Sequence, residues 1–95
     1  MNIGSAIKEL RLTRCLNQGE FATRIGITQA YLSQIERGHK KPSMEVLEYM
    51  AKDLNLPLPI MFWFGVENED IEETKKEAFE MLKPSIDAMI KSLLL

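Results

Sequence analysis

Side chains that can hydrogen-bond to base edges recur at helical spacing in the second quarter of the chain. One face of a helix carries a row of small, amide and cationic side chains at i, i+3, i+4 and i+7: Ala30, Ser33, Gln34 and Arg37. Gln29, at the start of that helix, has an amide that can donate to and accept from one adenine edge, which discriminates between bases by about 1–3 kcal/mol. A solvated helix face is the alternative, but such a face usually displays Glu/Lys pairs, and this one has none. The face as a whole favours readout of bases.

Cationic residues surround this helix although the chain is slightly acidic overall. Arg37, Lys40 and Lys41 could contact phosphates, which would set register and affinity rather than sequence choice, and a solvated charge cluster is the alternative. The net charge is −2, yet residues 1–43 carry seven Lys or Arg against three acids, whereas residues 66–95 carry eight acids against four lysines. Because exposed charges act over about 8 Å at physiological salt, the local excess of cations is compatible with a nucleic-acid partner.

Two short helices joined by a tight turn must position these side chains. An apolar stripe precedes the turn at Phe21, Ala22 and Ile25, and a second stripe follows it at Leu32, Ile35 and Glu36. Gly26 lies where the chain must pass through a left-handed conformation, which costs glycine almost nothing. Thr28 can cap the second helix through its hydroxyl, worth about 1 kcal/mol. The region from residue 18 to residue 37 is therefore predicted to be a helix-turn-helix.

This segment resembles the helix-turn-helix of the Xre/Cro-like family, to which the lambdoid phage repressors belong. Small Ala22, Gly26, the apolar positions around them and the following Glu36-Arg37-Gly38 match that pattern. The resemblance covers roughly Met1 to Gly65 and implies an all-α, five-helix, lambda-repressor-like domain that binds double-stranded DNA. Gly19 departs from the pattern, and glycine in a first helical turn costs up to about 1 kcal/mol relative to alanine.

The resemblance also implies roles for individual residues. Base contacts are expected from Gln29 and Gln34, with Ser33 as a further candidate and Ala30, which replaces a glutamine, able to touch a thymine methyl. Tyr31 is expected at a phosphate or a base. Gln18 is expected at a phosphate, where the free N–H groups of a helix start also attract anions, although simple capping by Asn17 is an alternative.

Arg11 and Glu36 are predicted to form an ion pair. Glu36 lies on the inward stripe of its helix and needs a partner there. Family members carry an arginine at the position of Arg11, whose guanidinium could bind the carboxylate through two hydrogen bonds. A solvated Glu36 is the alternative.

The remaining helices of the first 65 residues follow from apolar periodicity. Helices are predicted from about Ile3 to Arg14, after a cap at Ser43, and over Ile60–Phe64. The helix after Ser43 places an apolar stripe at Leu47, Met50, Ala51 and Leu54. The aromatic residues of the last helix are expected in the core or an interface rather than in a ligand pocket.

Residues 66–95 are predicted to form a helical extension, either one helix or a pair kinked or restarted at Pro84. Helical spacing from Ile71 predicts a first part, and an apolar seam continues after the proline, with Asp87, Lys91 and Ser92 outside it. The seam either folds back on residues 60–64 or packs against a second copy. We favour the second copy, and the predicted dimer interface is Leu82, Ile86, Met89, Ile90 and Leu93.

Composition and motifs exclude several classes of protein. Ninety-five residues can bury one modest core. A single cysteine, Cys15, excludes an internal disulfide framework and fits a reducing cytoplasm, and the apolar stretch 54–66 is too short and too interrupted to span a bilayer. No metal-ligand spacing, glycine-rich phosphate loop or nucleophile with its base occurs, so neither an enzyme nor a cofactor is predicted.

The sequence thus predicts a cytoplasmic, sequence-specific DNA-binding regulator, a repressor. It would act as a homodimer whose two reading helices lie one DNA turn apart on a pseudo-palindromic operator. The alternative is an antitoxin or adaptor whose C-terminal helix binds a partner protein. Phage, plasmid and restriction-modification contexts all remain open.

Overall fold

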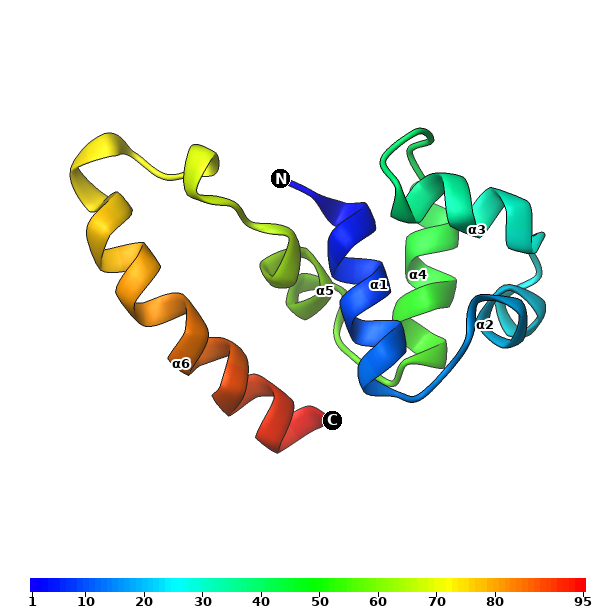
Figure 1. Cartoon of the computed structure of the whole chain (residues 1–95). Helices are drawn as coiled ribbons and strands as arrows, with labels where there is room; N and C mark the ends of the chain where they lie inside the picture. The colour runs from blue at the N-terminus through cyan, green and yellow to red at the C-terminus, as the bar shows by residue number, and fades with distance from the viewer.

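The computed structural model describes all 95 residues and contains only helices and their connections. The α-helices are α1 (Ile3–Thr13), α2 (Gln18–Ile25), α3 (Gln29–Glu36), α4 (Met44–Asp53), α5 (Leu58–Gly65) and α6 (Lys76–Leu94). Two 3₁₀ turns, η1 (Asn68–Asp70) and η2 (Glu73–Lys75), connect α5 to α6. Helices α1 to α5 pack together, and α6 lies along the side away from α2 and α3 (Figure 1). The predicted all-α, five-helix domain with an additional helix is confirmed.

Side-chain caps start the helices where the sequence predicts them. Asn17 Oδ1 accepts from Glu20 N at 2.7 Å, Thr28 Oγ1 from Tyr31 N at 3.1 Å, and Ser43 Oγ from Val46 N at 3.1 Å. Each cap satisfies one N–H group that the first helical turn leaves without a partner. The starts of α2, α3 and α4 are therefore set by local chemistry.

The predicted apolar stripes meet in one core of fifteen buried hydrophobic residues. It includes the stripes of α2 and α4 and, from α1, Ala6, Ile7 and Leu10. Gly4 allows α1 to approach the end of α3, because a Cβ there would lie 2.2 Å from Ile35 O. Gly26 has φ +78°, and nothing lies within 4 Å of a Cβ built on it, so its role in the turn is conformational.

The connection from α5 to α6 differs from the prediction. Helix α5 is longer than Ile60–Phe64 and includes Pro59 in its first turn, where proline is tolerated. Residues 71–75 are not part of the last helix, because the chain takes two 3₁₀ turns before α6. Within this connection Asp70 accepts from the α-ammonium of Met1 at 2.7–2.8 Å, which lowers the pKa of the carboxyl group and raises the pKa of the amino group.

Helix α6 runs through Pro84 without restarting, contrary to one of the two arrangements predicted. Pro84 has no N–H group to donate to the carbonyl of Glu80, four residues earlier. Both residues are exposed, so water can reach that carbonyl. The extension is therefore one helix.

None of the helices combines the length and the apolar content that a membrane-spanning helix needs.

Helix α6 folds back on its own chain through polar side chains. Trp63 Nε1 donates to Asp87 Oδ1 at 2.8 Å, and Lys83 Nζ, 3.0 Å from Asp87 Oδ2, lies 5.2 Å from the centre of the Trp63 ring. Lys91 Nζ donates to Glu9 Oε1 at 2.7 Å. The fold-back arrangement that the sequence left as an alternative is therefore present, and it uses the charged residues predicted to lie outside the seam.

This contact covers one edge of the predicted apolar seam of α6. Ile90 packs against the core, and Ile86 is half-buried. Leu82, Met89 and Leu93 remain exposed on the outer face. Ile86 and Ile90 are thus less exposed than the other three residues of the predicted dimer interface.

Candidate nucleic-acid interface

Helix α3 presents a polar face to solvent because its opposite face is held in the core. Leu32, Ile35 and Glu36 are buried, which fixes the rotation of the helix. Of the predicted base-contacting residues, Gln29 and Ala30 are exposed, and Ser33 and Gln34 are half-buried at the edge of the same face. Tyr31 is also half-buried and packs against the core.

The end of α3 is closed by its own backbone and leads directly into the cationic loop. Gly38, with φ +81°, donates from its N–H to Ile35 O at 3.0 Å, and His39 N donates to Gln34 O at 2.8 Å. These bonds satisfy the last carbonyls of the helix. They also hold the start of the loop that carries Lys40 and Lys41 against α3.

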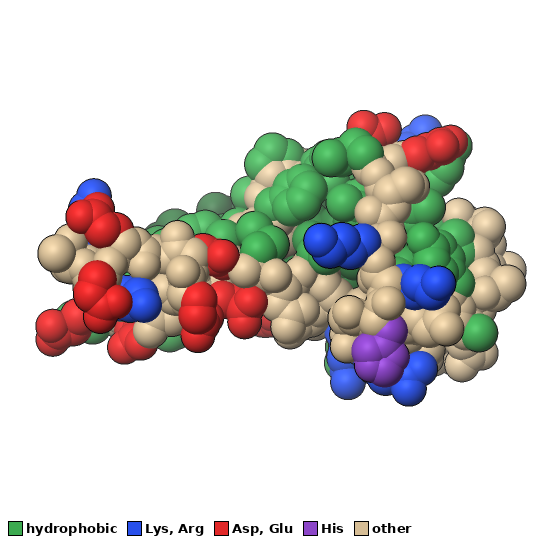
Figure 2. Space-filling view, turned by 90° about the horizontal axis from the view of Figure 1, so that it is seen from above, with side chains coloured by type: hydrophobic (Ala, Val, Ile, Leu, Met, Phe, Trp, Pro, Cys, Tyr) green, Lys and Arg blue, Asp and Glu red, His purple; other side chains and the backbone are tan.

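Arg37, Lys40 and Lys41 are exposed and form no ion pair. The Arg37 side chain makes one long hydrogen bond, from Nε to Ser33 O at 3.4 Å. By contrast Arg24 is paired with Asp53 at 3.1 Å. In Figure 2 the acidic side chains gather mainly at one end of the molecule, and lysines or arginines lie beside the histidine at the other. The three unpaired cations are therefore available to phosphate without breaking an internal contact.

A buried network connects α1, α2 and α3 beneath the exposed face. Arg11 Nε and Nη2 donate to Glu36 Oε2 and Oε1 at 2.7 and 2.9 Å, and Arg11 Nη1 donates to Leu16 O at 2.7 Å. Gln18 Nε2 donates to Glu36 Oε1 at 3.0 Å. The structure thus brings Arg11 and Glu36 together and turns the Gln18 amide inward. A phosphate contact through that amide would require its bond to Glu36 to break.

The proximity of Gly19 to the Gln29 side chain was not predicted from the sequence. A Cβ at Gly19 would lie 3.3 Å from Gln29 Oε1, so the glycine leaves room for this side chain beside the first turn of α2. The unusual glycine in a helix start was the available signal. The Gln29 side chain, on α3, therefore lies beside the first turn of α2.

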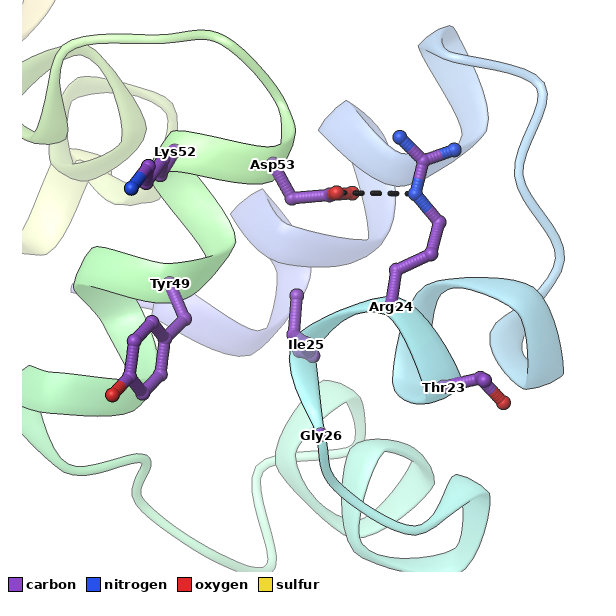
Figure 3. Close-up of a pocket in the computed structure, with 7 residues that line it drawn as sticks. All are labelled: Thr23, Arg24, Ile25, Gly26, Tyr49, Lys52 and Asp53. Carbon is purple, nitrogen blue, oxygen red and sulfur yellow. Dashed lines mark hydrogen bonds and ion pairs between the residues drawn. The ribbon is translucent and has the colours of Figure 1, made fainter.

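A separate hollow opens between the end of α2 and helix α4 (Figure 3). Its volume is about 580 Å³, and its lining residues are Thr23, Arg24, Ile25, Gly26, Tyr49, Lys52 and Asp53. Arg24 and Asp53 point toward each other across it. None of the residues predicted to contact DNA lines this hollow.

Comparison with known proteins identifies the motif. The helix-turn-helix family HTH_3 matches residues 7–60, more than half of the chain. The chain belongs to this family. The predicted resemblance is thereby confirmed, and the family is one of DNA-binding regulators rather than enzymes.

Relatives of this chain include proteins named as transcriptional regulators. An uncharacterized HTH-type transcriptional regulator of Mycobacterium tuberculosis is 39% identical over 59 residues, which are 62% of this chain and 42% of that protein. This chain therefore spans less than half of that relative. The cryptic phage CTXphi transcriptional repressor RstR of Vibrio cholerae is 33% identical over 89 residues, covering 94% of this chain and 71% of the repressor.

A solved structure shares the arrangement of the helices. The SinR protein/SinI protein complex contains a chain that matches with a TM-score of 0.62 at 28% identity. The match covers 92% of this HTH_3 chain and 78% of the other. The likeness therefore extends beyond α1–α5 into the C-terminal extension.

Proposed function

We propose that this HTH_3 protein is a cytoplasmic, sequence-specific transcriptional repressor that binds a pseudo-palindromic operator as a homodimer. One observation carries the proposal: the exposed face of α3 holds hydrogen-bonding side chains and no carboxylate, and it adjoins three unpaired cations. A B-DNA major groove is about 12 Å wide and accepts one α-helix. Helix α3 would enter the groove with Gln29 foremost, since this residue lies at its start.

The two kinds of side chain would do different work in the complex. Gln29, Ala30, Ser33 and Gln34 would read base edges. Arg37, Lys40, Lys41 and Tyr31 would contact phosphates and set the register of α3 in the groove. The expected phosphate contact of Gln18 would come from a side chain that now bonds Glu36, so it is the contact most dependent on a local rearrangement.

The proposed roles divide the chain into two domains. Residues 1–65 would form the DNA-binding domain, and residues 66–95 would form the dimerisation element. Separating the two functions explains the opposite charges of the two parts, because acids in the extension lie away from the cationic loop after α3 (Figure 2). A dimer would double the base contacts of one short α3 helix.

Selection of bound duplexes from a random DNA pool tests the proposal directly. We expect an inverted repeat to be recovered, and fluorescence anisotropy should show that the purified protein prefers it to random duplex. Binding should weaken with added salt, with log K falling by about 0.9 per phosphate contact for each unit of log salt concentration. Failure to bind any duplex at low ionic strength would refute the proposal.

A second candidate is an antitoxin or adaptor whose extension grips another protein. The SinR/SinI neighbour is a complex of two proteins, and α6 of this chain exposes a large apolar surface. Expression in the native cell followed by purification would distinguish the candidates. A fixed partner of different sequence at equal stoichiometry would favour the adaptor.

A further inference from the structure

The outer face of α6 is apolar along its length, and nothing in the chain covers it. Its large side chains are more than half exposed: Met81 at 74%, Leu82 at 57%, Met89 at 60% and Leu93 at 75%. Small residues fill the remaining positions of this arc: Ala78, Ser85 and Ser92. No charged residue falls on it, whereas Asp87 and Lys91 lie on the side that contacts the body of the chain.

Five of these residues have the spacing of a helix-pairing seam. Ala78, Leu82, Ser85, Met89 and Ser92 follow one another in steps of four, three, four and three residues. These steps are the a and d positions of a heptad pattern. Small residues occupy every seventh position, and the two large residues lie between them. A second helix can therefore approach closely at the small positions if it offers large side chains there.

We propose that this seam packs against the same seam of a second copy, with the two α6 helices antiparallel. In that orientation Leu82 faces Ser92 of the partner subunit, and Met89 faces Ser85 of the partner subunit. The four layers from Leu82 to Ser92 then each combine one large and one small side chain, which fills the space between the helices evenly. A parallel pair would stack serine on serine and leave voids beside layers of paired large residues.

The position of the two-fold axis sets the register. When that axis passes level with Asp87, Met81 of one chain lies level with Leu93 of the other, on the opposite edge of the seam. A shift by one heptad toward the N-terminus of α6 would leave Leu93 beside the 3₁₀ turns and uncovered. From Ala78 to Ser92 the seam is about 21 Å long, at 1.5 Å per residue.

The pattern of large and small residues on the seam is complementary to itself, and this is why we infer that a second copy of the chain packs against it. A helix of different sequence would have no reason to match alternating large and small positions in reverse order. The inference rests on the proposed homodimer and deepens it, because it replaces the predicted interface by one that omits Ile86 and Ile90 from its centre. Those two residues are already partly covered by their own chain.

Sedimentation equilibrium on the full chain tests the seam. We expect a wild-type dimer, and we expect Leu82→Glu to reduce the mass from twice the chain mass to the chain mass of 10.9 kDa. Leu12→Glu is the matched control, because Leu12 is 54% exposed on α1, close to the 57% of Leu82. Far-UV circular dichroism should be unchanged in both variants, because each still folds. The melting temperature should fall only for Leu82→Glu, which loses the stabilisation by the second copy. A dimeric Leu82→Glu protein, or a monomeric wild-type protein, would overturn the inference.

Disulfide trapping tests the orientation. In a Cys15→Ser background, chains carrying Leu82→Cys are mixed with chains carrying Ser92→Cys and oxidised. Antiparallel pairing should link the two different chains, whereas Ser92→Cys alone should link poorly to itself. Efficient self-linkage of Ser92→Cys would instead indicate parallel helices and contradict the proposal.

DNA binding separates failure of this inference from failure of the proposed function. A monomeric Leu82→Glu variant should still bind one half-site, because α3 is unchanged, and it should lose the extra affinity for the full inverted repeat. If Leu82→Glu remains dimeric and binds the operator normally, the seam assignment fails alone. If no variant binds DNA, the proposed function fails whether or not the dimer forms.

Discussion

At the scale of single residues, the exposed face of α3 separates specificity from affinity. Gln29 can make two hydrogen bonds to one base edge, whereas Lys40 carries a flexible point charge suited to phosphate. Thr28 caps the start of α3 next to Gln29, and Gly19 leaves room for the Gln29 side chain. A substitution at Gln29 should therefore change which DNA sequence is preferred, and a substitution at Lys40 should change how affinity depends on salt concentration.

Gln29→Ala should weaken binding to the preferred operator by about 1–3 kcal/mol for each half-site and leave binding to random duplex nearly unchanged. Lys40→Ala should weaken binding to both duplexes alike and reduce the slope against salt by about one for each bound chain. Fluorescence anisotropy with both duplexes at several salt concentrations measures these effects. Equal losses on both duplexes for Gln29→Ala would contradict its role in base readout.

Glu36→Ala should destabilise the fold by about 3–5 kcal/mol, because it leaves the buried guanidinium of Arg11 without its carboxylate. Urea unfolding followed by circular dichroism gives the free energy of unfolding. Glu72→Ala is the control, since its pair with Lys75 is exposed and should contribute less than about 1 kcal/mol. A loss for Glu36→Ala no larger than that of the control would mean that the network contributes little.

At the scale of elements, local signals determine α1 to α4, and long-range contacts determine α6. Asn17, Thr28 and Ser43 cap helices within three residues of themselves, so their roles can be predicted from sequence. From the sequence, Asp87 and Lys91 were expected to lie outside the seam as solvated charges. Their partners, Trp63 and Glu9, lie 24 and 82 residues away along the chain. No periodicity within α6 could indicate which of its two partly apolar faces meets the body.

At the candidate site, too, the features that depend on local spacing could be predicted, and those that depend on distant residues could not. The outer row of α3 follows from the spacing of one helix, and its cations follow from composition. The inward turn of Gln18 depends on the position of Glu36, eighteen residues later, and on a glutamine rotamer that spacing does not specify. Pro84 also did not mark a helix boundary, since it lies inside a continuous helix.

Trp63→Phe should loosen α6 from the body while leaving the five-helix core folded. The substitution keeps an aromatic ring beside Phe79 and removes the N–H group that donates to Asp87, which costs about 1–3 kcal/mol for a bond to a charged acceptor. Hydrogen exchange should be faster in α6 and unchanged in α1. Phe62→Leu, in the same helix but outside this contact, serves as the control. Unchanged exchange in α6 would show that the indole bond does not hold the helix.

At the scale of the whole molecule, the reading helix and the proposed pairing helix lie far apart. The longest dimension of the chain is 41 Å, and α6 and α3 occupy opposite sides of the helical body (Figure 1). A dimer joined through the outer face of α6 would place the two α3 helices beyond the 34–36 Å or so of one DNA turn. We therefore expect half-sites two turns apart, not one as the sequence alone suggested, and the recovered inverted repeats measure that distance.

The remoteness of α6 from α3 also makes rotational phase a determinant of repression. Adding about five base pairs between half-sites would turn one of them to the far side of the duplex, whereas adding about ten would restore its direction. A rigid body of this length could not twist to follow the first insertion.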